Sequence, residues 1–405
     1  MDVLISGASV SGPVAAYWLR RAGFRVTVVE RAPALRKAGG HAVDLFSPAL
    51  AIVERMGVLD QVQARRTGTE RMVVLREGAR RPTTIDLGRL MAGLSRRHVE
   101  IMRDDLAEIL YAATRDDVEY VFGDHITGIG DDGEVSFAHG RPRRFDLVIG
   151  ADGLHSGVRG LVFGPESEYA TWIGAYIAVA SIPNYPGLRD EMRGLVGVDR
   201  LVGLYSGRHM SDARALFLFR TPTELAYDRH DPDAQRRLLR ARFGDLGWEV
   251  PRLLDETDRA SAFYFDSVTQ LRRPHWTRGR VALVGDAGYC PGPAVGGSTS
   301  LAVVGAYTVA GELAAAGGDP TRAFPAYEAA MADYVARSRA FAITMARRIV
   351  PGSRAATWAM TSGVKLFTAL PTALARRLWA AGDAGLHDTV AVRDYPQLAE
   401  SVSGR

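Results

Sequence analysis

Apolar positions at the start of the chain change from strand-like to helical spacing and back again. Residues 3–5 and 25–30 are short apolar runs, and residues 13–22 carry apolar side chains at helical intervals. A strand, a helix and a second strand in this order predict a βαβ unit.

Two further strand-like runs, at residues 144–149 and 280–284, each lead into a turn that contains Gly and Asp. A helix rich in small residues, roughly 299–316, follows the second run. The pattern predicts an α/β protein with a discontinuous, Rossmann-like cofactor domain drawn from residues 1–168 and 274–345.

The stretch between these two parts reads differently. Runs with alternating apolar positions at 173–182, 201–205 and 215–220 are typical of sheet strands. We therefore expect residues 169–273 to form an inserted, mixed β-sheet domain that binds substrate. Residues 346–405 are expected to be C-terminal helices, interrupted at Pro351 and Pro371.

Composition and charge exclude several classes of protein. The 405 residues are 47% hydrophobic and 24% charged, include one cysteine, Cys290, and carry a formal net charge of +4. A single cysteine excludes intramolecular disulfides and CxxC zinc sites, and the histidines show no metal-ligand spacing. No apolar run is long enough to span a membrane, and the first residues lack a signal peptide. We expect a cytoplasmic monomer or homodimer with no nucleic-acid partner, because the arginines are spread along the chain.

The turn of the βαβ unit carries a dinucleotide fingerprint, Gly7-x-Ser9-x-x-Gly12, with Val10 and Ser11 inside it. In this pattern the first glycine makes a tight turn and the last lets helix and strand pack closely, while the helix N-terminus binds phosphate. Glu30 ends the second strand, where an acid binds ribose hydroxyls. An ordinary turn that needs small residues is the alternative.

The strand that ends at Gly285-Asp286 distinguishes FAD from NAD. Its carboxylate is suited to a ribitol hydroxyl, and the glycine-rich loop at 291–297 leads into a helix whose N-terminus favours the negative charge of a reduced flavin. A dehydrogenase that binds only NAD has no need of this second site.

These segments together resemble the group A FAD-dependent aromatic monooxygenases, a family that includes p-hydroxybenzoate hydroxylase and the compact tetracycline-inactivating enzymes. The resemblance rests on residues 7–12, on Gly150-Ala151-Asp152-Gly153, and on Gly285-Asp286 with Pro293, Gly296 and Gly297, and it spans roughly residues 1–345. It implies hydroxylation through a flavin C4a-hydroperoxide, with NADH or NADPH as reductant and O2 as co-substrate.

The resemblance also implies roles for single residues. Glu30 would bind the adenosine ribose, Arg103 would contact FAD, and Asp286 would contact the ribitol. Asp152 and Gly153 would lie on the pyrophosphate and NAD(P)H side. Further cofactor contacts are expected from Gly40, in a segment flanking the flavin, and from Pro293, Gly296, Gly297 and Ser298. Apart from the resemblance, Arg31 and Arg36 are candidates to approach the cofactor phosphates or NADPH. The family often has Gly-x-Gly-x-Asn where this chain has residues 296–300, Gly-Gly-Ser-Thr-Ser.

Other candidates are weaker. His41 and Asp44 fall where flavin and substrate should meet, so each is a candidate base or substrate contact. Substrate contacts are also predicted for Tyr176, Phe217 and Phe219, with core packing as the alternative, and for Arg208 and Arg214, with exposed turns as the alternative. Cys290 lacks a partner expected to activate a thiol.

We predict an FAD-dependent monooxygenase that hydroxylates an aromatic or polycyclic, phenol-like small molecule. Two alternatives remain open: a reductase or dehydrogenase of the same superfamily that inserts no oxygen, and a flavin-binding sensor without turnover. A flavin-dependent halogenase is not expected, because neither Lys37 nor Lys365 lies in the Lys-x-x-Gly-x-x-x-Trp pattern of those enzymes.

Overall fold

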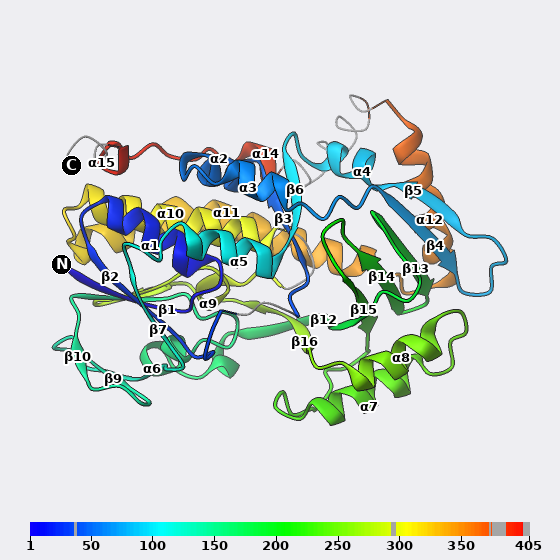
Figure 1. Cartoon of the computed structure of the whole chain (residues 1–405), viewed down its shortest axis with the longest axis horizontal. Coiled ribbons are helices and arrows are strands. Elements are labelled where there is room, and N and C mark those ends of the chain that lie inside the picture. Colours follow the sequence, from blue (N-terminus) through cyan, green and yellow to red (C-terminus); the bar gives the residue numbers. More distant parts are fainter. Residues whose placement is uncertain (36–38, 293–296, 372–373, 375–385, 400–405) are drawn as a thin grey trace.

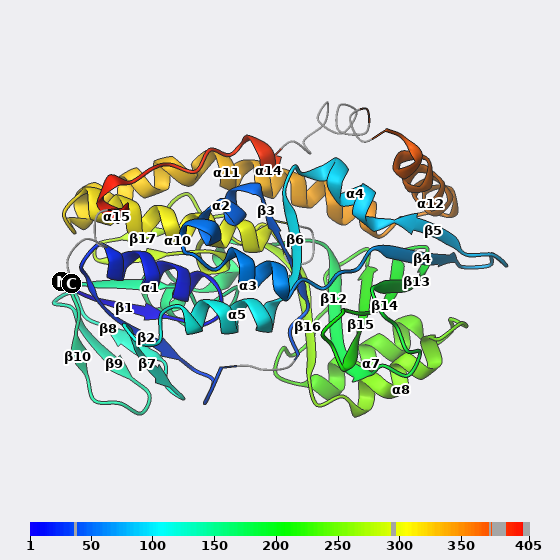
Figure 2. The same ribbon diagram turned by 45° about the horizontal axis from the view of Figure 1, so that its top comes forward.

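Two β-sheets lie side by side along the long axis of the molecule, with long helices running past both (Figures 1 and 2). The computed structural model describes residues 1–35, 39–292, 297–371, 374 and 386–399. The predicted class, an α/β fold with a discontinuous parallel sheet and a second, mixed sheet, is confirmed.

The first sheet takes its strands from the beginning, middle and end of the chain. Its order is β17-β18-β11-β1-β2-β7, and all neighbours are parallel except β17 and β18. The strands are β1 (Asp2–Ser6), β2 (Arg25–Glu30), β7 (Glu119–Phe122), β11 (Leu147–Gly150), β17 (Thr277–Arg278) and β18 (Val281–Leu283). Strands β1, β11 and β18 are nearly continuous apolar runs, as expected when both faces of a parallel sheet are covered.

Helices cover one face of this sheet, and a small antiparallel sheet and a short helix lie toward the other (Figures 1 and 2). The covering helices are α1 (Ser11–Arg21), α5 (Arg103–Ala112), α10 (Ser298–Ala315) and α11 (Pro320–Ile349). The other side carries α6 (Gly157–Phe163), β8 (Ile126–Ile129), β9 (Glu134–Phe137) and β10 (Arg143–Arg144). Helix α10 is buried on nearly all sides, which explains its small, apolar composition.

The second sheet has seven strands in the order β16-β12-β15-β14-β13-β4-β5. Five come from the region predicted as an insertion: β12 (Ala170–Pro183), β13 (Glu191–Gly197), β14 (Arg200–Ser206), β15 (Asp212–Arg220) and β16 (Phe263–Leu271). Helices α7 (Pro232–Phe243) and α8 (Val250–Arg259) pack on one face of these strands.

The other two strands, β4 (Arg71–Arg76) and β5 (Thr83–Asp86), come from much earlier in the chain. Strand β4 pairs in parallel with β13, with Arg71 opposite Glu191, and this pairing makes the sheet mixed. This pairing was not predicted from the sequence. A parallel pairing between strands so distant in sequence leaves no local turn signal.

The remaining elements connect the two sheets. Strands β3 (Ala42–Phe46) and β6 (His98–Met102) form a two-stranded ribbon, accompanied by α2 (Ser47–Arg55), α3 (Leu59–Ala64), α4 (Leu87–Leu94) and the single turn α9 (Asp286–Tyr289). Beyond α11 come α12 (Arg354–Ala369), α14 (Leu386–Thr389) and α15 (Pro396–Ala399). Helices α11 and α12 end just before Pro351 and Pro371, the positions expected to interrupt them. Within the described residues, no helix has the length and apolarity needed to cross a membrane.

Candidate active site

The turns after three parallel strands meet at one edge of the first sheet. Strand β11 lies between β1 and β18, so the turns that follow them are neighbours. Gly7 has a φ of +107°, and a Cβ added to it would lie 2.5 Å from the carbonyl oxygen of Ala151. A Cβ on Gly285, whose φ is +65°, would lie 3.2 Å from Ser11 Oγ. At Gly7, segments distant in sequence therefore approach so closely that only glycine fits, and at Gly285 the positive φ favours glycine.

The fingerprint turn leaves the start of α1 open for an anion. A Cβ on Gly12 would lie 1.9 Å from the carbonyl oxygen of Gly7, so the strand and helix approach at the closest distance a backbone allows. The helix begins after Val10, and no side chain caps its free N–H groups. Free N–H groups and the helix dipole together favour phosphate. The turn therefore fits the pyrophosphate of a dinucleotide.

Glu30 lies beside this turn, at the end of β2. Its two carboxylate oxygens accept hydrogen bonds from the backbone N–H groups of Ala8 and Ala32, each at 2.9 Å. A half-buried carboxylate in this position is suited to accept from ribose hydroxyls as well.

Arg103 connects the fingerprint turn with the glycine-rich segment at 39–45. It is the first residue of α5, its Nε donates to Ser9 Oγ at 3.2 Å, and its backbone N–H donates to the carbonyl oxygen of His41 at 3.1 Å. Gly40 N–H donates to Asp104 Oδ2 at 2.7 Å, and a Cβ on Gly40 would collide with that carboxylate. These contacts hold the segment against the start of α5.

The second turn, at Asp152 and Gly153, is built around a capping carboxylate. Asp152 accepts from the Ser156 hydroxyl and from the backbone N–H of Val158 at 3.2 Å, at the start of α6. Burial raises the pKa of this carboxyl group. Gly153 has a φ of +83° and open space where a side chain would be, so the backbone there remains accessible to a ligand.

Arg159 is a structural residue to which the sequence analysis assigned no role. Its guanidinium is fully buried and donates to the carbonyl oxygens of Ala287 at 3.0 Å and Leu154 at 2.6 Å. It therefore ties the turn after β11 to the turn after β18. Its partner Ala287 lies 128 positions away, and no local sequence pattern indicates that contact.

The third turn presents Asp286 at the start of α9. Burial raises the pKa of its carboxyl group, and the positive charge of Arg103 opposes that rise. Burial also raises the pKa of the neighbouring Cys290 thiol well above its usual value, so this thiol stays protonated. Gly297, with a φ of +91°, precedes Ser298 at the start of α10. Arg36, Pro293 and Gly296 lie outside the described residues.

His41 and Asp44 form the wall opposite these turns. The His41 ring stacks on Tyr264 with 6.1 Å between ring centroids. Burial, and then the charge of Arg103, lower the pKa of His41 to about 4, so its imidazole is neutral at physiological pH. Asp44 Oδ1 lies 2.7 Å from His98 Nε2. Burial opposes a charge on His98, but the hydrogen bond and charge of Asp44 outweigh it and raise the His98 pKa.

The strand that carries Asp44 is fastened to the start of α10. Ser300 Oγ donates to the Asp44 carbonyl oxygen at 3.1 Å and accepts from Phe46 N–H at 3.0 Å. The segment at 41–46 and the first turn of α10 are thus held in a defined relation.

The predicted substrate residues fall into two groups. Tyr176, Phe217 and Phe219 are buried on the face of the second sheet that packs on α7 and α8. Arg208 lies in an exposed turn and pairs with Asp190 at 3.2 Å. Arg214 is buried, and its Nε donates to the Gly40 carbonyl oxygen at 2.9 Å.

Tyr205 joins the candidate site without having been predicted. Its hydroxyl oxygen accepts from Ala42 N–H at 3.0 Å, next to the Arg214 contact. The opposite face of the same sheet carries Ile177, Val179 and Leu218, which pack with Tyr264 and with the end of α11. This apolar face, rather than the face under α7 and α8, adjoins the wall at 41–46.

A groove of about 630 Å³ lies between α6 and the second sheet, and its lining includes Arg31, His155, Arg229 and His230. The Arg31 guanidinium is 3.9 Å from the position of a Cβ on Gly157. His155 Nε2 lies 3.0 Å from Asp266 and its Nδ1 lies 3.0 Å from Glu166. Burial disfavours its charge, but the two carboxylates outweigh burial and raise the His155 pKa to about 9. Among the described residues, no three His, Cys, Asp or Glu side chains are grouped to hold a metal ion.

Comparisons with known proteins agree with this arrangement. The model of the FAD binding domain family matches residues 1–345. An uncharacterized protein of Mycobacterium tuberculosis is 44% identical over 341 residues, covering 83% of this chain and 91% of that one. A flavin-dependent monooxygenase of Legionella longbeachae is 39% identical over 346 residues, covering 85% and 88% of the two chains. The crystal structure of the tetracycline destructase Tet(55) matches with a TM-score of 0.82 and 34% identity, over 97% of this chain and 98% of that one.

Proposed function

Since the chain belongs to the FAD binding domain family and is an FAD-dependent monooxygenase, we propose that it hydroxylates an aromatic or polycyclic, phenol-like small molecule at the expense of NADH or NADPH and O2. The observation that carries the proposal is the meeting of the three turns at Gly7, Ala151 and Gly285 opposite the wall at 41–46.

When bound, FAD supplies the oxygen-activating chemistry. The protein's own residues position the reactants and exclude water from the site. Tyr205 and Arg214 fix the backbone of the flavin-flanking segment. His41 is neutral, so it can accept a hydrogen bond from a phenolic hydroxyl.

The groove at Arg31 and His155 supports a pyridine dinucleotide as reductant. A volume of about 630 Å³ suits a ligand of this size. The lining carries three arginines, Arg31, Arg159 and Arg229, and a protonated His155 against the carboxylates of Glu166 and Asp266. Its excess of positive charge attracts phosphate groups at neutral pH.

The similarity to Tet(55) supports a polycyclic substrate with phenol or enol groups. Tetracycline destruction is the activity named for that relative. For this chain, the similarity suggests which compounds to test first: tetracyclines, polycyclic phenols and simple phenols.

The decisive experiment combines spectroscopy with isotope labelling. The purified protein should show a flavin spectrum that anaerobic NADPH or NADH bleaches. Turnover with a substrate from the panel under labelled dioxygen should then place one labelled oxygen atom in the product. A product without label would favour a reductase or dehydrogenase. A bound flavin that neither nucleotide reduces would favour a sensor without turnover.

A further inference from the structure

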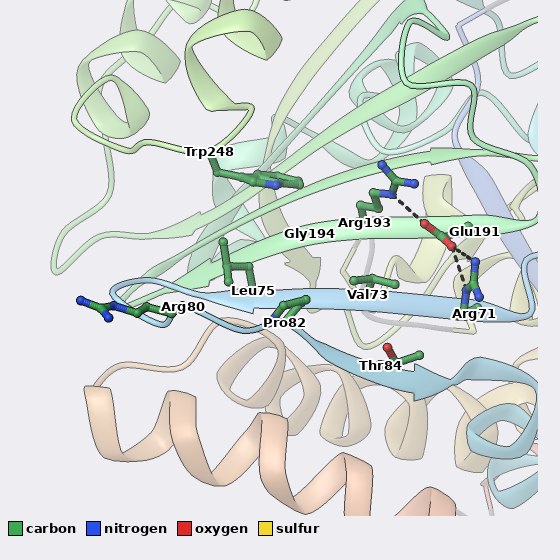
Figure 3. A pocket seen from close by; sticks show the side chains of 10 residues that line it. All are labelled: Arg71, Val73, Leu75, Arg80, Pro82, Thr84, Glu191, Arg193, Gly194 and Trp248. Carbon is green, nitrogen blue, oxygen red and sulfur yellow. Dashed lines mark hydrogen bonds and ion pairs between the residues drawn. The ribbon is translucent and has the colours of Figure 1, made fainter.

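The outer face of the second sheet contains a groove remote from the flavin site. It has a volume of about 470 Å³ and is lined by Arg71, Val73, Leu75, Arg80, Pro82, Thr84, Glu191, Arg193, Gly194 and Trp248 (Figure 3). We propose that this groove is a second small-molecule site, and that it binds a planar aromatic carboxylate.

The groove exists because the sheet is wider than the helices that cover it. Helices α7 and α8 pack on strands β12 to β16 through a shared apolar core, which includes Leu195 of β13 and meets Leu75 of β4 at its edge. Strands β4 and β5 extend the sheet beyond that core, on the far side of β13. The same face of these edge strands is therefore left uncovered by α7 and α8, and it forms the floor of the groove.

Trp248 forms one wall. It lies in the turn between α7 and α8, and its φ of +59° is uncommon for a residue other than glycine. The indole stands over the groove and faces Leu75 across it, with Val73 and Pro82 further along the floor (Figure 3). An indole on one side and aliphatic side chains on the other are suited to hold a flat ring.

A cluster of charges lies at the other end of the groove (Figure 3). Buried Glu191 accepts from Arg71 Nε at 2.8 Å through one carboxylate oxygen, and from Arg193 Nε at 2.6 Å through the other. Two guanidinium groups thus share one carboxylate, which leaves one positive charge in excess.

The terminal nitrogens of Arg193 have no hydrogen-bond partner among the described residues. Free guanidinium N–H groups in a fixed fork are matched to a carboxylate. An apolar slot next to an excess of guanidinium donors therefore selects a ligand with a flat apolar body and one anionic end.

The groove is separate from the proposed flavin site. Its lining comes from β4, β5, β13, the turn between β4 and β5, and Trp248. The three glycine turns lie in the other half of the molecule, at the edge of the first sheet (Figures 1 and 2). A ligand in the groove would therefore leave the flavin spectrum unchanged.

Calorimetric titration of the FAD-loaded enzyme with sodium 2-naphthoate tests the proposal. We expect saturable binding that does not alter the visible flavin spectrum, and at least tenfold weaker binding of the neutral analogue 2-naphthamide. Trp248→Leu and Arg193→Met should each weaken the binding of 2-naphthoate by about tenfold or more. The control variants Trp358→Leu, on exposed α12, and Arg237→Met, on exposed α7, should bind it as the wild type does.

The proposal is overturned if wild-type enzyme shows no saturable binding of 2-naphthoate, or if binding perturbs the flavin spectrum. It is also overturned if either Trp248→Leu or Arg193→Met binds the probe normally, because the proposed site needs both the indole of Trp248 and the guanidinium of Arg193. If Arg193→Met does not fold, Arg193→Lys replaces it. The Arg193→Lys variant keeps a positive charge beside Glu191 but loses the planar guanidinium group. The proposal requires that it also bind 2-naphthoate more weakly than the wild type does.

Discussion

The Nε atom of Arg214 donates a hydrogen bond to the carbonyl oxygen of Gly40 at 2.9 Å, across 174 positions of sequence. The contact joins β15 of the second sheet to the segment expected to flank the flavin. Asp212, at 2.5 Å from Arg214 Nη1, holds the guanidinium in place. The second sheet thus helps to position the segment at 39–45.

Replacing Arg214 with Met should therefore lower the stability of the fold and weaken the coupling of NADPH oxidation to substrate hydroxylation. The variant loses a buried, charge-assisted hydrogen bond, so the free energy of unfolding should fall by about 1.5–3 kcal/mol. A less ordered wall should also admit water and divert turnover toward hydrogen peroxide. Chemical denaturation and the ratio of peroxide to NADPH consumed measure the two effects. The matched control Arg208→Met, which removes only an exposed ion pair, should change neither.

Gly12→Ala should abolish tight FAD binding. The new Cβ would lie 1.9 Å from the Gly7 carbonyl oxygen, so the turn must open and its N–H groups lose their alignment. We expect FAD to bind at least roughly 100-fold more weakly, as measured by flavin fluorescence during titration of the apoprotein. Gly363→Ala, in α12 with no atom within 4 Å of the new Cβ, should retain wild-type affinity. Normal FAD affinity in Gly12→Ala would contradict the assignment of the pyrophosphate site.

Because His155 is positively charged at neutral pH, the affinity for NADPH should fall as the pH rises through about 9. Its pKa is raised to about 9, so the imidazolium persists at neutral pH and is lost as the pH rises through 9. The apparent dissociation constant for NADPH should therefore increase above that pH, measured by stopped-flow flavin reduction. In His155→Gln the constant should be higher at neutral pH and should lack this step.

The same shift makes a prediction about stability. The folded-state pKa of His155 lies above its ordinary value of 6.5, so protonated His155 stabilises the fold fully below pH 6.5 and progressively less as the pH rises toward 9. The difference in unfolding free energy between wild type and His155→Gln should shrink over that interval. A difference that grows with pH would contradict the ion pairs with Asp266 and Glu166.

His41 should behave in the opposite way. Its folded-state pKa of about 4 lies below 6.5, so protonation favours the unfolded chain, and wild-type stability should fall relative to His41→Gln as the pH drops from 6.5 toward 4. The full difference is at most about 3 kcal/mol. Denaturation curves at several pH values measure it. A constant difference would show that His41 is not held neutral.

The family and cofactor were accessible from sequence because the fingerprint turn, the Gly-Asp turns and the strands before them are local patterns. The family model and the relatives confirm the FAD-dependent monooxygenase. The individual flavin contacts, the domain boundaries, the reductant and the aromatic substrate stay predictions. Gly7 and Gly12 explain why the local signal was strong, since a Cβ at either position would overlap a backbone carbonyl oxygen.

The positions of the candidate substrate residues were harder to predict from the sequence, for a physical reason. In a strand, alternate residues point to opposite faces. The pattern at Tyr176, Phe217 and Phe219 therefore predicted a sheet, but it could not predict which face of the sheet packs on α7 and α8. The structure places these rings under the helices. Arg214, treated as a candidate among exposed turn residues, instead lies buried against Gly40.

The sequence by itself determined the βαβ unit, the two Gly-Asp turns and the buried helix after them, because each depends on the conformation of a few adjacent residues. Only the tertiary structure decided that β4 joins β13, that Arg159 bridges two turns, and that Tyr205 and Arg214 hold the wall at 41–46. These contacts join residues far apart in the chain, so their energy depends on how the whole fold packs, and no local pattern records it.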